Sequence, residues 1–420
     1  MMVGLEPGKN NSGGAEDSSR PAETAAGPSA PPRPGTPSAL AGALFGVSWR
    51  EVPGLLPGIL LAGAVMAAAQ ALAAVLGRGL LRLEGIDPAG RPSPVSGIMV
   101  AILIGMLVAN TVGVPRIFLP GVGFAMKKLL RLGIILVGIR LSLLDVASLG
   151  ALAVPVVATI VAVALVVTTW FARRIGVSEN LGTLAAASTA ICGVTAALAV
   201  APVIEADERE VAYTIANVTL FGALAMFVDP YLAHALFGRT STAVGLFLGT
   251  GIHDTSQVMG AALSYKELFH DEVALKVATV TKLTRNLFLA VVVPLLAYRH
   301  ARRKGGGSGG AAVRLRSLFP LFVAGFVAMA IVRSAGDASL ARAGLAWGGF
   351  DAASWTALVK MLGETWAGAA LATAMAGVGL TTRFSVFRGL GARPLYVGAL
   401  SATVVSALAL LLASIVGPRM

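Results

Sequence analysis

Residues 242–264 read TAVGLFLGTGIHDTSQVMGAALS, and this stretch decides the fold. At about 1.5 Å per residue it is long enough to cross a bilayer core of roughly 30 Å as a helix. Its centre is polar, because Gly249 and Gly251 precede the ionisable pair His253 and Asp254. Glycine tolerates a break in a helix, and ionisable side chains inside a membrane are costly and usually mark function. The stretch therefore predicts a membrane helix that is interrupted at its middle.

A second stretch has the same design. Residues 181–204 read LGTLAAASTAICGVTAALAVAPVI, with small and hydroxyl residues from Ser188 to Thr195 at the centre. An interruption there bares backbone amides, and the N-terminus of the new half-helix favours an anion. A close contact between helices through small side chains is the alternative, since membrane bundles use such contacts routinely. Both interpretations stay open for 181–204, whereas the ionisable pair favours a site in 242–264.

The rest of the chain has the composition of a membrane protein. Its 420 residues are 56% hydrophobic and 13% charged, with a mean hydropathy of +0.80. Soluble domains carry about 25% charged residues. Apolar runs of this length in lipid form helices, because every backbone polar group must be paired internally. We expect an all-α, polytopic membrane protein with about eleven spans, at 55–77, 96–113, 120–139, 149–171, 181–204, 211–236, 242–264, 276–298, 318–335, 355–380 and 394–416.

The net charge of +12 does not indicate a nucleic-acid-binding protein. The basic residues lie in short loops between apolar runs, which is typical of loops retained in the cytoplasm. The single cysteine, Cys192, excludes an intramolecular disulfide, and the four histidines form no ligand motif such as HExxH. There is also no GxSxG elbow and no P-loop. We therefore expect no cofactor, no metal and no enzymatic activity.

The N-terminal part differs in composition from the rest. Residues 1–50 begin with a Gly-, Ser-, Pro- and Ala-rich segment without an early apolar core, which predicts a disordered tail rather than a signal peptide. Residues 51–420 form the predicted transmembrane domain. Lys and Arg are more frequent in the predicted loops that lie on the same side of the membrane as the N-terminus. This bias indicates that the N-terminus is cytoplasmic and that the protein lies in the inner (plasma) membrane.

The sequence also contains a candidate internal repeat. GIRLS begins at Gly138 and GLTTR at Gly379, each at the end of one apolar helix and before another. At this offset of 241 residues the third and tenth spans correspond, as do the fourth and eleventh. Spans seven apart run in opposite directions, as an inverted repeat requires. Chance matching within an Ala-, Val- and Leu-rich sequence is the alternative.

Two cations lie inside the eighth span. Lys282 and Arg285 are three residues apart and so share one face of a helix. They are suited to compensate Asp254 or to meet an anion, and Arg is the better oxyanion ligand. Snorkelling toward the headgroups is the alternative, and it is easier for Lys282. For His253 and Asp254 the alternative is an interfacial position in contact with water.

From these patterns we derive a set of candidate site residues. The candidates for substrate binding are Ser188, Thr189, Cys192, Gly193, Thr195, Gly249, Thr250, Gln257, Lys282 and Arg285. The candidates for ion coupling are His253 and Asp254. Weaker candidates are Tyr213 and Asn217, on one face of the sixth span, and Glu364 in the tenth.

Several polar motifs occur in an order that resembles a known family. STAICGVTAALAVAPVIEADEREVAYTIANVTLFGALAMF (188–227), GTGIHDTSQVMGAAL (249–263) and VATVTKLTRNLFL (277–289) are similar to the YeiH-like family, often labelled sulfate exporters. The resemblance covers about residues 53–416. It implies a place in the cation:proton antiporter and anion transporter superfamily, with inverted repeats and crossing interrupted helices. Relatives often have Glu after the histidine, so Asp254 keeps the carboxylate but shortens its reach.

The expected function is that of a secondary transporter that exports a small inorganic or organic anion, coupled to protons or sodium. A cation:proton antiporter and a membrane protein without transport activity are the alternatives, and a homo-oligomer is left open. One feature of the pattern is inconsistent with crossing helices, because the fifth and seventh spans would run parallel. Either one of them is re-entrant, or the tenth span (355–380) is the partner of the fifth.

Overall fold

The computed structural model describes residues 52–83, 87–88, 93–303, 320–387 and 392–420. The predicted 1–50 tail lies outside them. The described residues form helices and no β-strand, which confirms the all-α class. Within these ranges, six helices are long and apolar enough to cross a membrane: Val52–Leu83, Leu143–Arg174, Glu208–Phe237, Glu272–Arg303, Leu321–Ala343 and Ala392–Arg419. The count of eleven spans stays a prediction.

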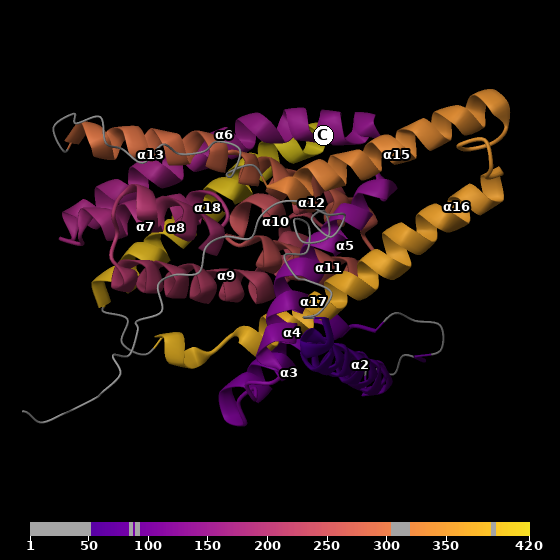
Figure 1. The fold of residues 1–420 in the computed structure, drawn as a ribbon, viewed down its shortest axis with the longest axis horizontal. Helices are drawn as coiled ribbons and strands as arrows, with labels where there is room; N and C mark the ends of the chain where they lie inside the picture. The colour runs from indigo at the N-terminus through magenta and orange to yellow at the C-terminus, as the bar shows by residue number, and fades with distance from the viewer. Residues whose placement is uncertain (1–51, 84–86, 89–92, 304–319, 388–391) are drawn as a thin grey trace, which may run out of the picture. The chain divides into compact units, whose positions relative to one another are not determined.

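Figure 1 shows the described helices and their order along the chain. In chain order they are α2 (Val52–Leu83), α3 (Gly97–Thr111), α4 (Leu119–Phe124), α5 (Leu130–Val137), α6 (Leu143–Arg174), α7 (Glu179–Ala190), α8 (Val194–Val200), α9 (Glu208–Phe237), α10 (Ser241–Gly251), α11 (Thr255–Phe269), α12 (Glu272–Leu287), α13 (Leu289–Arg303), α15 (Leu321–Ala343), α16 (Ala352–Lys360), α17 (Ala367–Thr381) and α18 (Ala392–Val416). π-Helical turns at Ala125–Leu129 and Met361–Trp366 join α4 to α5 and α16 to α17.

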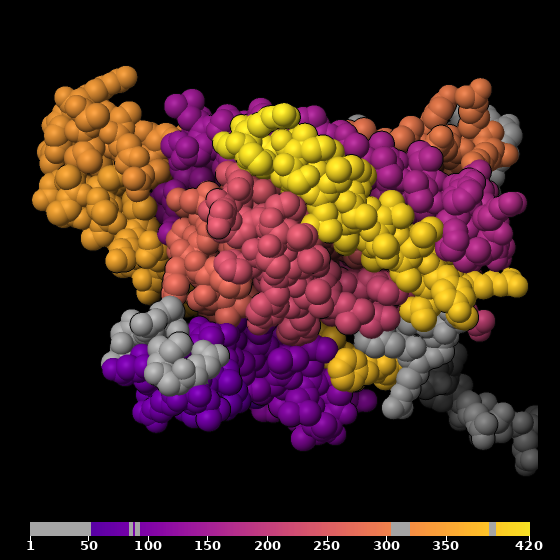
Figure 2. Space-filling model, turned by 180° about the vertical axis from the view of Figure 1, so that it is seen from behind, coloured from indigo at the N-terminus to yellow at the C-terminus, as the bar shows by residue number. Residues whose placement is uncertain are grey.

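The helices pack as two bundles. One contains α2, α3, α5, α15 and α17, and we call it the scaffold bundle. The other contains α6 to α12 and α18, and we call it the hairpin bundle. Figure 1 shows α7, α8, α9 and α10 grouped together, apart from α2, α3 and α4. From behind, the yellow helix α18 crosses the rose-coloured segment that includes α10 (Figure 2).

The fifth predicted span doubles back on itself. After α7, residues 191–193 form a tip, and α8 returns toward the start of α7. Ser178 Oγ, just before α7, donates to Glu210 Oε1 (2.5 Å), which lies beyond the end of α8. Glu179, the first residue of α7, pairs with Arg303 at the end of α13. We call this part of the bundle the Glu179 end, defined by Ser178, Glu179, Glu210 and Arg303.

The seventh predicted span doubles back from the other end. α10 runs to a tip at residues 252–254, and α11 returns. His234, near the end of α9 and the start of α10, stacks on Phe269 at the end of α11, with ring centroids 3.7 Å apart. We call this part the His234 end, defined by His234, Tyr265, Phe269 and Glu272. α9 runs from the Glu179 end to the His234 end, so the two hairpins enter the bundle from opposite ends.

Two glycines bring α10 onto α12. A Cβ at Gly245 would lie 2.6 Å from the Ala274 carbonyl oxygen, and a Cβ at Gly249 would lie 2.9 Å from the Ala278 carbonyl oxygen. Glycines four residues apart let two membrane helices approach backbone to backbone. For Gly249 the structure therefore gives a packing role, and this contact carries the tip of α10 to the middle of α12.

Two contacts occur twice, once in each copy of the predicted repeat. The first is a glycine contact: a Cβ at Gly138 would lie 2.3 Å from the Phe326 carbonyl oxygen, and a Cβ at Gly379 would lie 2.4 Å from that of Ile102. The glycines are 241 residues apart and the carbonyls 224 residues apart. The packing of α5 on α15 thus has a counterpart in the packing of α17 on α3.

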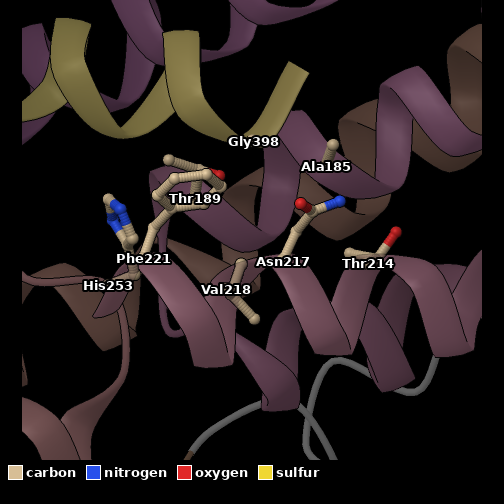
Figure 3. Close-up of a pocket in the computed structure, with 8 residues that line it drawn as sticks. All are labelled: Ala185, Thr189, Thr214, Asn217, Val218, Phe221, His253 and Gly398. Carbon is tan, nitrogen blue, oxygen red and sulfur yellow. The ribbon is translucent and has the colours of Figure 1, made fainter. Parts of the chain in front are cut away.

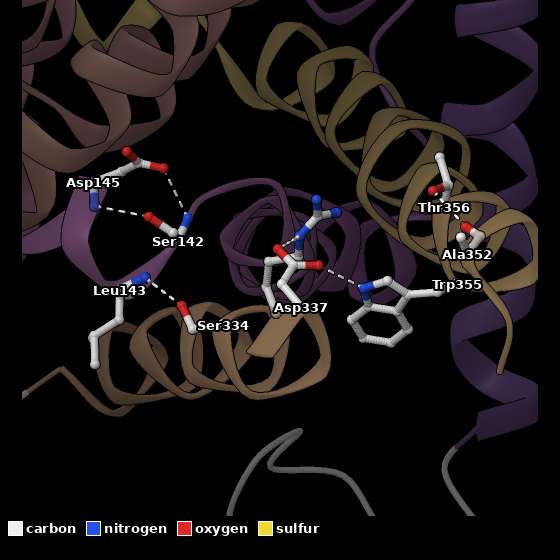
Figure 4. Close-up of polar contacts among 9 residues, drawn as sticks. Ser142, Leu143, Asp145, Ser334, Asp337, Ala352, Trp355 and Thr356 are labelled. Atoms are coloured by element: carbon white, nitrogen blue, oxygen red, sulfur yellow. Dashed lines mark hydrogen bonds and ion pairs between the residues drawn. The ribbon is translucent and has the colours of Figure 1, made fainter. Parts of the chain in front are cut away.

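The second repeated contact is a hydrogen bond. Leu143 N donates to Ser334 Oγ (2.7 Å), beside the capping box in which Ser142 and Asp145 begin α6 (Figure 4). Phe384 N donates to Asn110 Oδ1 (2.6 Å). The donors are again 241 residues apart and the acceptors again 224. Chance matching of an alanine-rich sequence does not account for two equivalent tertiary contacts at one pair of offsets.

Substitution of either repeated glycine is expected to destabilise the protein. Gly138→Ala and Gly379→Ala each place a methyl group against a backbone carbonyl, so helices must separate, at roughly 1–3 kcal/mol as for other overpacked sites. Gly368→Ala in α17 is the matched control, because a Cβ there meets no atom within 4 Å and alanine favours helix. Thermal melting of the detergent-purified protein measures the effect. Melting temperatures unchanged by both substitutions would contradict the repeated contact.

Candidate functional site

The tips of the two hairpins meet. A Cβ at Gly193 in the first tip would lie 3.1 Å from Asp254 Oδ1 in the second. Gly193 has φ +62°, a conformation that disfavours any residue with a side chain. The middle of α12 passes both tips and contributes two cations. We call the hub the set formed by the tips and these cations: residues 191–193, residues 252–254, Lys282 and Arg285.

Lys282 joins the two tips through its ammonium group. The side chain is buried, and Nζ donates to the carbonyl oxygens of Ile191 (3.3 Å), Ile252 (3.0 Å) and His253 (2.5 Å). An ammonium group has three donors, and all three are used here. The acceptors belong to both hairpins, so Lys282 holds the tips together.

Arg285 binds the ends of the two half-helices that lead into the tips. It is 0% exposed. Its Nε donates to Ala190 O (2.7 Å), Nη1 donates to Thr250 O (2.6 Å) and Ile252 O (3.2 Å), and Nη2 donates to Thr189 O. The last carbonyls of a helix have no partner within the helix and carry partial negative charge. The guanidinium therefore satisfies the C-terminal ends of α7 and α10, with four of its five N–H donors.

Asp254 occupies the N-terminal end of α11. Its Oδ2 accepts hydrogen bonds from Ser256 N (2.9 Å) and Ser256 Oγ (2.5 Å). Gln257 completes a capping box, since its Oε1 accepts from Asp254 N (3.3 Å), and its Nε2 donates to Thr219 O (3.2 Å) on α9. The N-terminal end of this half-helix is thus capped by a carboxylate of the chain itself.

A small cavity lies beside His253 (Figure 3). Its volume is about 10 Å³, close to the space that one water molecule needs. It is lined by Ala185, Thr189, Thr214, Asn217, Val218, Phe221, His253 and Gly398. His253 Nδ1, Asn217 Oδ1 and Thr214 Oγ1 are buried without a hydrogen-bond partner in the described part of the chain. The residues that line this cavity therefore carry three buried polar atoms without a hydrogen-bond partner.

The other predicted site residues lie at or near the tips, with one exception. Ser188, Thr189, Cys192 and Thr250 are buried, and Ser188 Oγ has no hydrogen-bond partner among the described residues. Thr250 Oγ1 donates back to Leu246 O (2.6 Å). Thr195 on α8 is exposed and does not face the hub. Substrate binding and ion coupling by these residues stay predictions.

A second intramembrane carboxylate was missed in the sequence. Asp229 in α9 is 5% exposed, and its Oδ2 has no hydrogen-bond partner within the described ranges. It lies inside the predicted span 211–236, so the rule that flagged Asp254 applies equally to it. Asp229 lies 3.7 Å (Oδ2) from the position of a Cβ at Gly251, which is the last residue of α10.

Glu364 does not lie at the hub. It pairs with Arg140 (3.2 Å), which also pairs with Glu272 (2.5 Å), and Lys266 completes this ion-pair network at the His234 end. The network joins the scaffold bundle to the start of α12. In the described residues no three His, Cys, Asp or Glu side chains are grouped as metal ligands.

Fold and site together define a class: an α-helical membrane protein in which two helical hairpins, tied by buried cations, meet tip to tip. The family described as conserved hypothetical protein 698 matches residues 57–398. The chain belongs to this family, which is the YeiH-like family that the motifs resemble.

Its relatives carry the name UPF0324 membrane protein. One from Nitratidesulfovibrio vulgaris is 30% identical over 352 residues, which cover 81% of this chain and 88% of the relative. One from Bacillus cereus is 32% identical, covering 76% of this chain and 87% of the relative, and one from Agrobacterium fabrum is 34% identical, covering 70% and 78%. No solved structure matches the chain. The name of these relatives and the long apolar helices of the described residues together show that the protein is membrane-embedded.

Proposed function

We propose that the protein is a secondary transporter of a small inorganic or organic anion, coupled to protons or sodium. One observation carries the proposal: two buried cations, Lys282 and Arg285, and one carboxylate, Asp254, lie where the hairpin tips meet. Burying a cation in a membrane costs several kcal/mol, so the excess positive charge is a feature to be explained. An anion bound at the hub offsets that charge.

The cations act on such an anion mainly through their field. Their donors are directed to backbone carbonyls, and Arg285 keeps one N–H donor beyond its four bonds. Direct hydrogen bonds to the anion then come from nearby hydroxyls, of which Ser188 Oγ and Thr281 Oγ1 are buried without a partner among the described residues. Sulfate, with its tetrahedral acceptor oxygens, is the first anion to test.

The arrangement of the helices supports alternating access. Hairpins that enter from opposite ends, together with two contacts repeated at fixed offsets, are what an inverted-repeat transporter has at its centre. Movement of the hairpin bundle against the scaffold bundle would expose the hub to one side and then the other. With the positive-inside rule, the Glu179 end and the N-terminus are cytoplasmic.

A cation:proton antiporter is the second candidate, favoured by the two intramembrane carboxylates Asp229 and Asp254. Such an antiporter needs a site of net negative charge. The presence of Lys282 and Arg285 at the hub works against it, because they repel a cation. Glu364 contributes no negative charge to such a site, since it forms an ion pair with Arg140.

Flux into proteoliposomes tests the proposal. The purified protein should mediate saturable uptake of radiolabelled sulfate, or of sulfite or a small carboxylate that competes with it, under an imposed proton or sodium gradient. Liposomes without protein are the negative control. A dye assay that follows a sodium or pH gradient tests for cation:proton antiport. Gradient-driven cation exchange with no anion flux would replace the first candidate by the second.

Asp254→Asn is expected to reduce net anion uptake at least about ten-fold, because the hub then holds two cations without a carboxylate and retains its anion. Asp207→Asn is the matched control, since Asp207 caps α9 with the same capping-box geometry but lies exposed, away from the hub. Asparagine caps helices about as well as aspartate, so both variants should insert and fold. Equal uptake by the two variants would remove Asp254 from the mechanism.

A further inference from the structure

Asp229 is a buried carboxylate that the hub contacts do not use. It lies in α9, and Oδ2 has no hydrogen-bond partner in the described chain. No described Lys, Arg or His forms an ion pair with it, in contrast to the other carboxylates at the bundle contacts, such as Glu272 and Glu364. A carboxylate buried without a positive partner is favoured in its neutral, protonated form. The side chain is therefore built to hold a proton.

The elements around α9 provide no nearby substitute partner. α8 and α10 carry no titratable side chain. The titratable groups on the other helices that pack against α9 lie at the bundle ends or in the hub: Glu179 on α7, Arg393 and Tyr396 on α18, Tyr265, Lys266 and Glu267 on α11, and His253 and Asp254 at the tip. The hub is thus the charged centre on which the state of Asp229 acts.

Asp229 lies beside the end of α10 that leads into the hub. Its Oδ2 lies 3.7 Å from the position that a Cβ of Gly251 would take. Gly251 follows Thr250, whose carbonyl accepts a hydrogen bond from Arg285 Nη1 (2.6 Å). Glycine leaves no side chain between the carboxylate and the end of α10. Inside a membrane, nearby charges interact much more strongly than in water.

We propose that Asp229 binds the coupling proton, and that protonation of Asp229 and binding of the anion at the hub favour each other. This inference rests on the proposed function. With Asp229 ionised, Lys282 and Arg285 are balanced by two carboxylates, Asp229 and Asp254. With a proton on Asp229 only Asp254 remains, and an anion restores the balance. By linkage the effect is reciprocal, so a bound anion strengthens the hold of Asp229 on its proton.

The sign of the pH dependence follows. Acid protonates Asp229, so anion binding strengthens as pH falls and weakens as pH rises. Between about pH 5 and about pH 8 the half-saturating sulfate concentration of the wild-type protein should rise about five-fold or more, the lower range of typical coupling energies. Asp229→Asn fixes the neutral state and should keep the tight, acid value throughout. Asp207→Asn, the same change at the exposed start of α9, should follow the wild type.

Two measurements separate this inference from the proposed function. The first is sulfate uptake against pH in the three proteins; a wild-type pH dependence that persists in Asp229→Asn overturns the inference while leaving the transporter intact. The second needs no transport: infrared difference spectra of the purified protein after a pH step should show a protonated-carboxyl band that Asp229→Asn lacks and Asp207→Asn keeps. The absence of that band overturns the inference even if no anion flux is found.

Discussion

Arg285→Ala is expected to cause a large loss of stability. The guanidinium donates four hydrogen bonds to carbonyl oxygens at the ends of α7 and α10. Without it the carbonyls of Thr189, Ala190 and Thr250 lose the partners that Arg285 supplies in a buried site, at about 1–3 kcal/mol for each unsatisfied group. The free energy of unfolding should fall by at least about 3 kcal/mol, and anion uptake should be lost.

Lysine does not rescue this site. A lysine at 285 has one compact ammonium group, which does not span the acceptors on two hairpins that the planar fork reaches. Arg285→Lys should therefore melt nearly as early as Arg285→Ala. Arg173→Ala is the matched control, since Arg173 is exposed and makes one ion pair with Glu179 (2.9 Å), which is worth about 0–1 kcal/mol. A detergent-purified Arg285→Ala protein that melts like the wild type would show that the tips do not depend on the guanidinium.

Arg285 also illustrates how much of the site could be predicted. The spacing of Lys282 and Arg285 placed both cations on one face of a buried helix, and the glycines of 242–264 marked the break in the facing element. Local chemistry of this kind is visible in a sequence. What the cations bind was not visible, because their acceptors are backbone carbonyls, and backbone carbonyls have no sequence signature. Asp254 or an anionic substrate was expected as the direct partner, whereas the half-helix ends take that place.

Asp229 and the hairpins were missed for different reasons. Asp229 had a signal, a lone acid in an apolar run, that was not used. The hairpins had no sequence signal that separates them from crossing helices. A span that doubles back and a span that crosses both consist of about twenty apolar residues. Only tertiary contacts, such as that of Ser178 with Glu210, distinguish the two. The predicted parallel course of the fifth and seventh spans was the one indirect hint, and the structure accounts for it because both segments double back.

The hairpins lead to an all-or-none prediction about topology. If both double back, Arg174 and Glu208, which flank the first hairpin, lie on one side of the membrane, and Arg239 and His270, which flank the second, lie on the other. If every span crosses fully, the members of each pair lie on opposite sides. All four residues are exposed, so a cysteine at any of them is open to a reagent from its own side. The buried Cys192 is first replaced by alanine to give a cysteine-free background.

The topology is measured by labelling these cysteines in intact spheroplasts with a membrane-impermeant thiol reagent. Arg239→Cys and His270→Cys should be labelled without permeabilisation, whereas Arg174→Cys and Glu208→Cys should be labelled only after it. The physical reason is that the broken backbone at each tip is shielded from lipid by α9, α12 and the facing hairpin, and non-helical backbone at membrane depth is tolerated where protein buries it. Labelling of Arg174→Cys and Glu208→Cys from opposite sides would contradict the first hairpin, and opposite labelling of the other pair would contradict the second. Either result would leave the hub without two half-helices that meet end to end, and the positive charge of Lys282 and Arg285 would then need another explanation.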